Sequence, residues 1–136
     1  LGFADRRMID GENGLLWEAR LTKGMTIDGL ARLVNESLQR KPLLVRASCA
    51  DREVHRLVVC TGGGQEYLAK AHQCGADVYL SGEISERTTH EARELGIHYL
   101  SAGHHATESY GIQALGQKIQ REFKLDIHFF DDQNPA

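Results

Sequence analysis

Residues 97–109 read IHYLSAGHHATES, and they pass from an apolar run into a helical pattern through one glycine and two histidines. The same order occurs twice upstream, where apolar runs at 55–60 and 77–81 lead into glycine-containing loops and then into helical patterns. Strands that alternate with helices need crossover connections, and such connections produce largely parallel sheets. We therefore predict an α/β fold with a mixed, mostly parallel sheet.

The rest of the chain supplies the other elements of this prediction. Thr26 is a typical N-cap residue, and the apolar positions after it repeat at the helical period as far as Leu38. Pro42 then ends that helix. We expect further strands at 15–21, 43–47 and 126–130, and further helices near 65–74, 85–95 and 107–123.

The chain length of 136 residues suits a single domain with a sizeable core, and we expect that domain to span residues 15–136. Residues 1–14 are polar, contain glycine and show no sustained period, so we expect them to form a linker. The chain begins with Leu1 and not with an initiator methionine. This favours a linker that follows an N-terminal region of a longer protein.

Charge and cysteine content narrow the class of protein. The chain has 16 Lys and Arg against 19 Asp and Glu, and the net charge of −3 argues against a general nucleic-acid-binding protein. The sequence shows no bilayer-length apolar run and no signal-peptide pattern, so we expect no membrane partner. Cys49, Cys60 and Cys74 form no C-x-x-C pair, which is typical of reduced thiols in a cytoplasmic protein.

Two adjacent histidines and a carboxylate mark the last of the three glycine loops. His104 and Glu108 are four residues apart, so a helix that begins near His104 carries both on one face, within reach of one cation. The alternative is a surface turn in which Glu108 is a first-turn acid favoured by the helix dipole. The carboxyl ends of parallel strands meet at one edge of a sheet, where ligands bind, so Glu83, His104 and His105 should lie together. This convergence favours the metal interpretation.

Two neighbouring features are open to more than one interpretation. Residues 61–64, TGGG, can present backbone N–H groups to an anion or can form a plain tight turn. The segment has neither the P-loop lysine nor the dinucleotide G-x-G-x-x-G spacing. Glu83 can be a general base, can orient a metal ligand, or can be an ordinary exposed loop acid. His90 and Glu94 are also four residues apart, but their polar surroundings are typical of a solvated helix face.

Three segments, in this order and spacing, closely resemble the NGG-interacting-factor-three-like family: CTGGGQ at 60–65, GEISE at 82–86 and GHHATE at 103–108. Bacterial members of that family are also called GTP cyclohydrolase I type 2 homologues or dinuclear metal-centre proteins. The resemblance implies a fold of two intertwined α/β repeats, of which this chain is the C-terminal one. It also implies a ring-shaped homohexamer and two divalent metal ions, commonly iron, zinc or manganese.

The resemblance also implies roles for individual residues. His104 and Glu108 match metal ligands that this half contributes, whereas Glu83 and His105 fall beside the site, where they can support a ligand or take part in catalysis. The remaining ligands, two histidines and an aspartate, belong to an N-terminal region outside this chain, so we expect an incomplete site here.

The implied function is metal-dependent hydrolysis of an unknown small molecule, for which the family label alone suggests a cyclohydrolase. The alternative is a non-catalytic, ring-forming scaffold or binding protein in which the metal is structural or regulatory.

Overall fold

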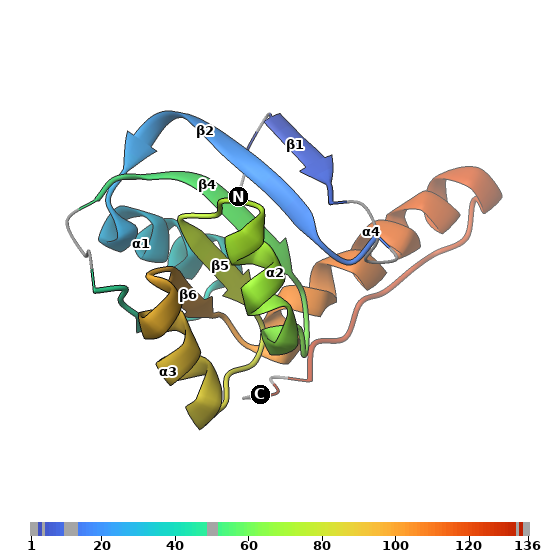
Figure 1. Ribbon diagram of the computed structural model, residues 1–136. Helices are drawn as coiled ribbons and strands as arrows, with labels where there is room; N and C mark the ends of the chain where they lie inside the picture. The colour runs from blue at the N-terminus through green and yellow to red at the C-terminus, as the bar shows by residue number, and fades with distance from the viewer. Residues whose placement is uncertain (1–2, 4, 10–13, 49–51, 133, 135–136) are drawn as a thin grey trace.

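The computed structural model describes residues 3, 5–9, 14–48, 52–132 and 134, and within them six strands form one sheet with helices on both faces (Figure 1). The strands are β1 (Asp5–Met8), β2 (Trp17–Met25), β3 (Leu43–Val45), β4 (Val54–Cys60), β5 (Val78–Ser81) and β6 (His98–Ser101). The helices are α1 (Ile27–Leu38), α2 (Leu68–Gln73), α3 (Glu86–Leu95) and α4 (His104–Phe123), with a short 3-10 helix, η1, over Gln65–Tyr67. The predicted α/β class is confirmed.

The strand order across the sheet is β1-β2-β4-β5-β6-β3. The central pairs β4–β5 and β5–β6 are parallel, as the repeated strand–loop–helix pattern predicted. The other three pairs are antiparallel, so the prediction of a mostly parallel sheet is wrong in that detail. The reason is topological, because β1, β2 and β3 lie outside the three repeated units and join the sheet at its edges without a crossover helix between parallel partners.

Both ends of the chain differ from the sequence-based expectation. Asp5–Met8, within the segment expected to be a linker, form β1 and pair antiparallel with β2. Residues 126–130, expected to be a strand, form none and instead run back along α4 (Figure 1). A strand needs a neighbour with free backbone N–H and C=O groups, and a helix has already used its own. The alternating apolar residues of this segment therefore pack beside a helix and not in the sheet.

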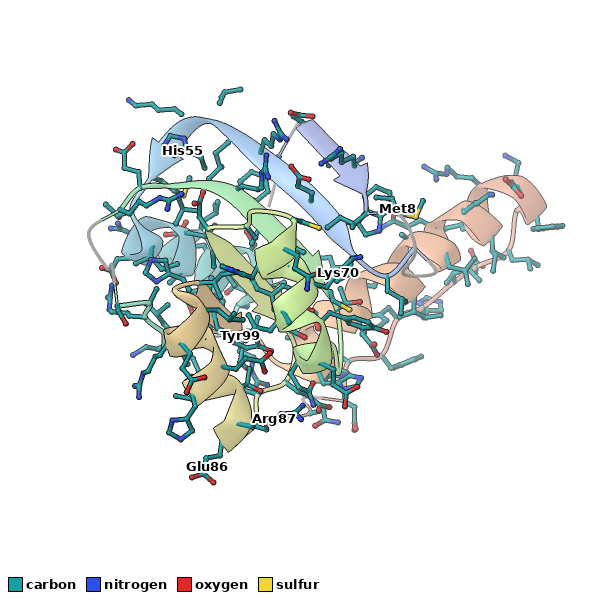
Figure 2. All side chains as sticks on the ribbon, in the orientation of Figure 1. Met8, His55, Lys70, Glu86, Arg87 and Tyr99 are labelled. Atoms are coloured by element: carbon teal, nitrogen blue, oxygen red, sulfur yellow. The ribbon has the colours of Figure 1, made fainter. Side chains whose placement is uncertain are left out.

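Helices α2 and α3 cover one face of the sheet. Tyr79 and Tyr99 are fully buried beneath them and meet edge to face, with ring centroids 5.5 Å apart. Figure 2 shows Tyr99 beneath these helices, whereas Glu86 at the start of α3 points away from the body. Cys60 belongs to the same apolar cluster, neither Cys60 nor Cys74 takes part in a disulfide, and Cys49 lies outside the described residues.

Helix α1 covers the other face. Its N-cap is Thr26, as predicted, and the Gly29 N–H donates to the Thr26 hydroxyl at 3.1 Å. The buried apolar side chains of α1 repeat at the helical spacing and are Ile27, Leu30 and Val34. Burying each of these stabilises the fold by about 1.5–3 kcal/mol.

Helix α4 begins at the sheet edge and projects beyond the body (Figure 1). Only Thr107 of this helix is buried among the described residues. Lys124 ends the helix in a left-handed conformation, with φ 57°, and the chain then reverses direction. Within the part of the chain that the structure describes, no helix combines the length and the apolar character needed to cross a bilayer.

Candidate functional site

The three glycine loops meet at the carboxyl edge of the parallel strands, as predicted. The Gly82 N–H donates to the Gly62 carbonyl at 2.9 Å, and the Gly103 N–H donates to the Gly82 carbonyl at 2.9 Å. These bonds extend the β4–β5–β6 ladder past the ends of its strands. Segments 20 and 21 residues apart in the sequence therefore form one continuous surface at this edge.

Two of these glycines are required by close contacts. Gly62 has a φ of +67°, and a Cβ there would lie 2.2 Å from Glu108 Oε1. A Cβ on Gly82 would lie 2.6 Å from the Gly62 carbonyl oxygen and 2.7 Å from the Cα of His104. Any side chain at either position would displace the start of α4 or the Glu108 carboxylate. The glycine loops thus set the position of the histidine and the glutamate.

The glycine-rich loop at 61–64 is a tight turn held by two buried hydroxyls. The Gly62 N–H donates to the Thr107 hydroxyl at 2.9 Å, and the Gly64 N–H donates to the Ser81 hydroxyl at 3.0 Å. Both hydroxyl-bearing residues are buried. These two N–H groups already have protein partners, so the turn interpretation of the loop is favoured over an anion cradle.

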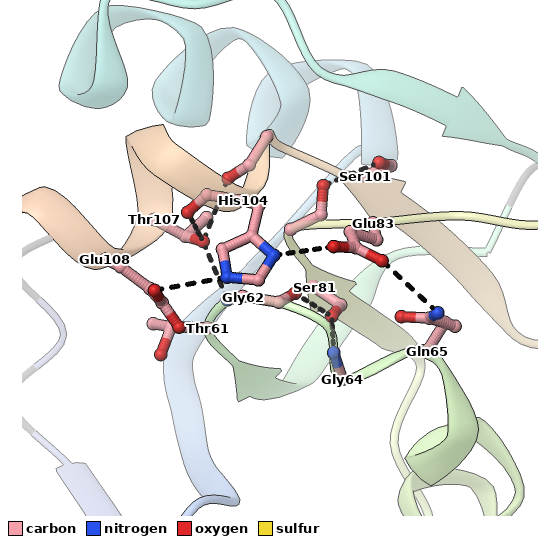
Figure 3. A network of polar contacts seen from close by, with 12 residues as sticks. Thr61, Gly62, Gly64, Gln65, Ser81, Glu83, Ser101, His104, Thr107 and Glu108 are labelled. Carbon is pink, nitrogen blue, oxygen red and sulfur yellow. Dashed lines mark hydrogen bonds and ion pairs between the residues drawn. The ribbon is translucent and has the colours of Figure 1, made fainter. Parts of the chain in front are cut away.

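His104 lies between two carboxylates (Figure 3). Its Nδ1 is 2.6 Å from Glu83 Oε1, and its Nε2 is 3.2 Å from Glu108 Oε2. Gln65 Nε2 donates to the other Glu83 oxygen at 3.4 Å. Helix α4 begins at His104, which places His104 and Glu108 one turn apart on the same face. The structure therefore brings together three of the four residues singled out in the sequence.

The two carboxylates change the protonation of the imidazole. The hydrogen bond with Glu83, reinforced by the charge of Glu108, raises the pKa of His104 above its ordinary value. The same hydrogen bond lowers the pKa of Glu83. Both shifts favour an ion pair, with the Nδ1–H donating to Glu83. Because the Nδ1–H donates to Glu83, the proton on Nε2 is the one that a cation facing Glu108 would replace.

The spacing of this pair is compatible with two ligands of one cation. Imidazole and carboxylate ligands lie about 2.1 Å from a divalent ion, and two of them at about 90–110° are roughly 3.0–3.4 Å apart. The 3.2 Å between His104 Nε2 and Glu108 Oε2 falls in that range. A carboxylate on the far nitrogen, as Glu83 supplies, commonly orients a metal-binding histidine. No group of three or more side chains within the described ranges is arranged to hold a metal ion. Within those ranges, His104 and Glu108 are therefore two candidate ligands and not a complete set.

His105 is turned to a different partner. Its Nε2 lies 2.9 Å from Asp131 Oδ1, in the segment that follows α4. It still lines the same open cleft as His104 and Glu108, which has a volume of about 410 Å³. The cleft also includes two large apolar side chains, Ile112 and Phe129.

Sequence reasoning missed several residues of this region. Thr107 anchors the 61–64 turn from the first turn of α4, although its sequence position gives no sign that it is buried. Phe129 reaches the cleft, and Asp131 reaches His105, only because the chain reverses after α4. The predicted closing strand at 126–130 placed Phe129 in the sheet and ended before Asp131, and no local pattern would have placed either residue beside α4.

These features define a class: an α/β protein with a histidine–glutamate pair at a strand edge built by three glycine loops. A model of the family Duf34/NIF3 (NGG1p interacting factor 3) matches residues 1–135. The chain belongs to this family.

Individual relatives agree with this assignment. A GTP cyclohydrolase 1 type 2 homolog from Allochromatium vinosum is 46% identical over 136 residues, which is all of this chain and 53% of the relative. A protein of the same name from Pasteurella multocida is 48% identical over 115 residues, which is 82% of this chain and 44% of the relative. The chain thus spans about half the length of the curated relatives it matches.

A solved structure gives the same result for the fold. The protein ybgI, described as of unknown function, superposes with a TM-score of 0.85 at 41% sequence identity. The match covers 90% of this chain and 49% of that protein.

Proposed function

We propose that this chain provides one half of a divalent-metal site in a metal-dependent hydrolase. His104 and Glu108 are the ligands, and the observation that carries the proposal is the 3.2 Å separation of Nε2 and Oε2 beside a fixed Nδ1–H. The names of the relatives suggest a cyclohydrolase that acts on GTP or on a related heterocycle. The substrate of this protein is a small molecule of that kind.

The residues of this chain have separate tasks in the proposal. Glu83 accepts the Nδ1–H and so holds the Nε2 lone pair toward the ion, which makes Glu83 a positioning residue. Glu108 supplies one anionic oxygen to the same ion. His105, oriented by Asp131 at the cleft wall, is the side chain available to move a proton. When bound, a divalent ion would lower the pKa of water and polarise the bond to be hydrolysed.

Two ligands do not complete such a site, and two divalent ions (iron, zinc or manganese) need more donors. The curated relatives are about twice as long as this chain, and we infer that the remaining ligands come from the other half of the full protein. A homohexamer in the cytoplasm is the assembly we propose for that full protein.

The test uses the full-length protein. Metal content and GTP turnover are measured for the wild type, for His104→Ala and Glu108→Ala, and for the control pair His90→Ala and Glu94→Ala. The control pair has the same spacing on α3, and both residues are exposed. We expect the first two variants to lose metal and turnover, and the controls to retain both. Stoichiometric metal without turnover of any nucleotide would contradict the cyclohydrolase proposal.

A second candidate, a ring-forming scaffold with a structural metal, is favoured by one observation. Large apolar side chains are exposed along α4 and the segment after it: Tyr110, Ile112, Leu115, Phe123, Leu125, Phe129 and Phe130. Exposed apolar surface of this extent is typical of an interaction face. If this candidate is correct, His104→Ala weakens the assembly of the full-length protein more than it lowers the rate of any catalysed reaction. A variant that keeps its assembly and loses only turnover would exclude it.

A further inference from the structure

The segment after α4 is seated on that helix at two separate places. Near the middle of the helix, Ile127 packs over Gly116, where an added Cβ would lie only 2.9 Å from Ile127 Cγ2. Near its start, Asp131 Oδ1 lies 2.9 Å from His105 Nε2. The two contacts fix the register of the returning chain, which Figure 1 shows running beside α4 toward the strand edge.

This register brings Phe129 to the cleft. Phe129 lies between the two contacts: it lines a groove along α4 together with Ile127, and a groove beside His105 together with Asp131. The ring lines the 410 Å³ cleft together with Ile112 and remains 44% exposed. The same cleft is lined by Glu83, His104 and Glu108, so it combines a polar ligand-bearing region with an aromatic and aliphatic wall.

We propose that Phe129 is a specificity-determining residue and that the cleft takes a planar heteroaromatic ring joined to an anionic group. The ring lies against Phe129 and Ile112, and the anionic group reaches the ion held by His104 and Glu108. This inference rests on the proposed metal site, because Glu83 and Glu108 would repel an anion without a cation between them. An exposed aromatic face stacks on flat rings. A cleft of 410 Å³ lies within the usual range of small-molecule sites.

The position of Phe129 in the cleft depends on the reversal of the chain after α4 and not on the metal ligands. Asp131 anchors the segment two residues beyond Phe129, by its contact with His105. Asp131 is therefore a positioning residue for the wall. Loosening this contact should weaken ring binding without removing a metal ligand.

The test measures binding of two probes to the zinc-loaded, full-length protein by calorimetry. GTP carries a ring and a triphosphate, whereas inorganic tripolyphosphate carries the charge without the ring. Phe129→Leu keeps an apolar side chain and removes the aromatic face, and it should weaken GTP binding by about 5- to 100-fold. Tripolyphosphate binding and zinc content should stay unchanged. Phe123→Leu is the matched control, since that ring is also exposed but lies at the far end of α4.

A second variant tests the anchoring. Asp131→Asn should weaken GTP binding in the same direction, by a smaller factor, with zinc content preserved. Two results would overturn this inference and leave the metal site standing, provided that the wild type binds zinc. One is that the wild type binds GTP no more tightly than tripolyphosphate, and the other is that Phe129→Leu binds GTP as tightly as the wild type. A wild type that binds no zinc overturns the proposed function itself, so the two failures are distinguishable.

Discussion

The Nδ1 of His104 lies 2.6 Å from Glu83 Oε1, although the two residues come from different loops and are 21 positions apart in the chain. This contact orients the imidazole so that its other nitrogen faces Glu108. Three side chains are thus in contact in a row, with His104 in the middle. Glu83 contacts Nδ1 of His104, and Glu108 faces its Nε2. Each contact in this row leads to a separate prediction.

Glu83→Gln should lower the metal affinity of the full-length protein by about 10- to 100-fold, the usual effect of removing a carboxylate that orients a histidine ligand. The amide keeps the size of the side chain and loses its charge. Competition with a chromophoric chelator measures the affinity. Glu86→Gln is the control, because Glu86 is an exposed acid at the start of α3. Equal affinities for Glu83→Gln and the wild type would show that Glu83 does not support the ligand.

Gly62→Ala should abolish metal binding, and Gly96→Ala should not. Both glycines have a φ of +67°, so both substitutions carry a similar backbone strain of about 1–2 kcal/mol. They differ in what a Cβ would meet: Glu108 Oε1 at 2.2 Å for Gly62, and nothing within 4 Å for Gly96. Urea denaturation and metal content of the two variants separate strain from displacement of Glu108. Metal retained in Gly62→Ala would mean that Glu108 can move without loss of the site.

Thr107→Val should destabilise the fold by about 1–3 kcal/mol, because it leaves the buried Gly62 N–H without its acceptor. Thr107→Ser retains the hydroxyl and should cost clearly less. Free energies of unfolding from urea titrations compare the two variants. If both are equally destabilised, the methyl group and not the hydrogen bond holds the turn.

The stability of the protein should fall in mild acid because of His98. Its Nδ1 accepts the Ala47 N–H at 3.1 Å, and burial, helped by Arg46, lowers the pKa of His98 below its usual value. In the unfolded chain the ordinary pKa of a histidine is about 6.5. Below that pH the unfolded state binds more protons, so the free energy of unfolding decreases until the pH passes the lowered folded-state pKa.

His98→Asn removes the titrating group and keeps an acceptor for the Ala47 N–H. The difference in unfolding free energy between pH 7.5 and pH 5.5 should therefore shrink in this variant. His90→Asn, an exposed position on α3, serves as the control and should keep the difference found in the wild type. An unchanged difference in His98→Asn would assign the acid sensitivity to other groups.

The central part of the fold was predictable because its pattern is local. Apolar runs followed by glycine loops and helices predicted β4, β5 and β6, and the Thr26 cap predicted the start of α1. The spacing of His104 and Glu108 predicted their proximity once α4 began at His104. The resemblance carried by the segments at 60–65, 82–86 and 103–108 agrees with the Duf34/NIF3 family match.

The predictions that failed concern pairing partners. The strand expected at 126–130 has an alternating apolar pattern, but that pattern does not specify whether the partner is a sheet or a helix. The direction of β1, β2 and β3 relative to their neighbours also depends on connections that a local pattern does not encode.

Local sequence patterns were enough to predict the element types of the core and to identify the histidine–glutamate pair, because hydrophobic period, capping and helical spacing act over a few residues. The tertiary structure decided which carboxylate orients His104, which hydroxyl holds the 61–64 turn, and that Phe129 reaches the cleft. Each of these depends on contacts between segments about 17 to 45 residues apart. Such contacts form only when packing and backbone pairing close the chain on itself.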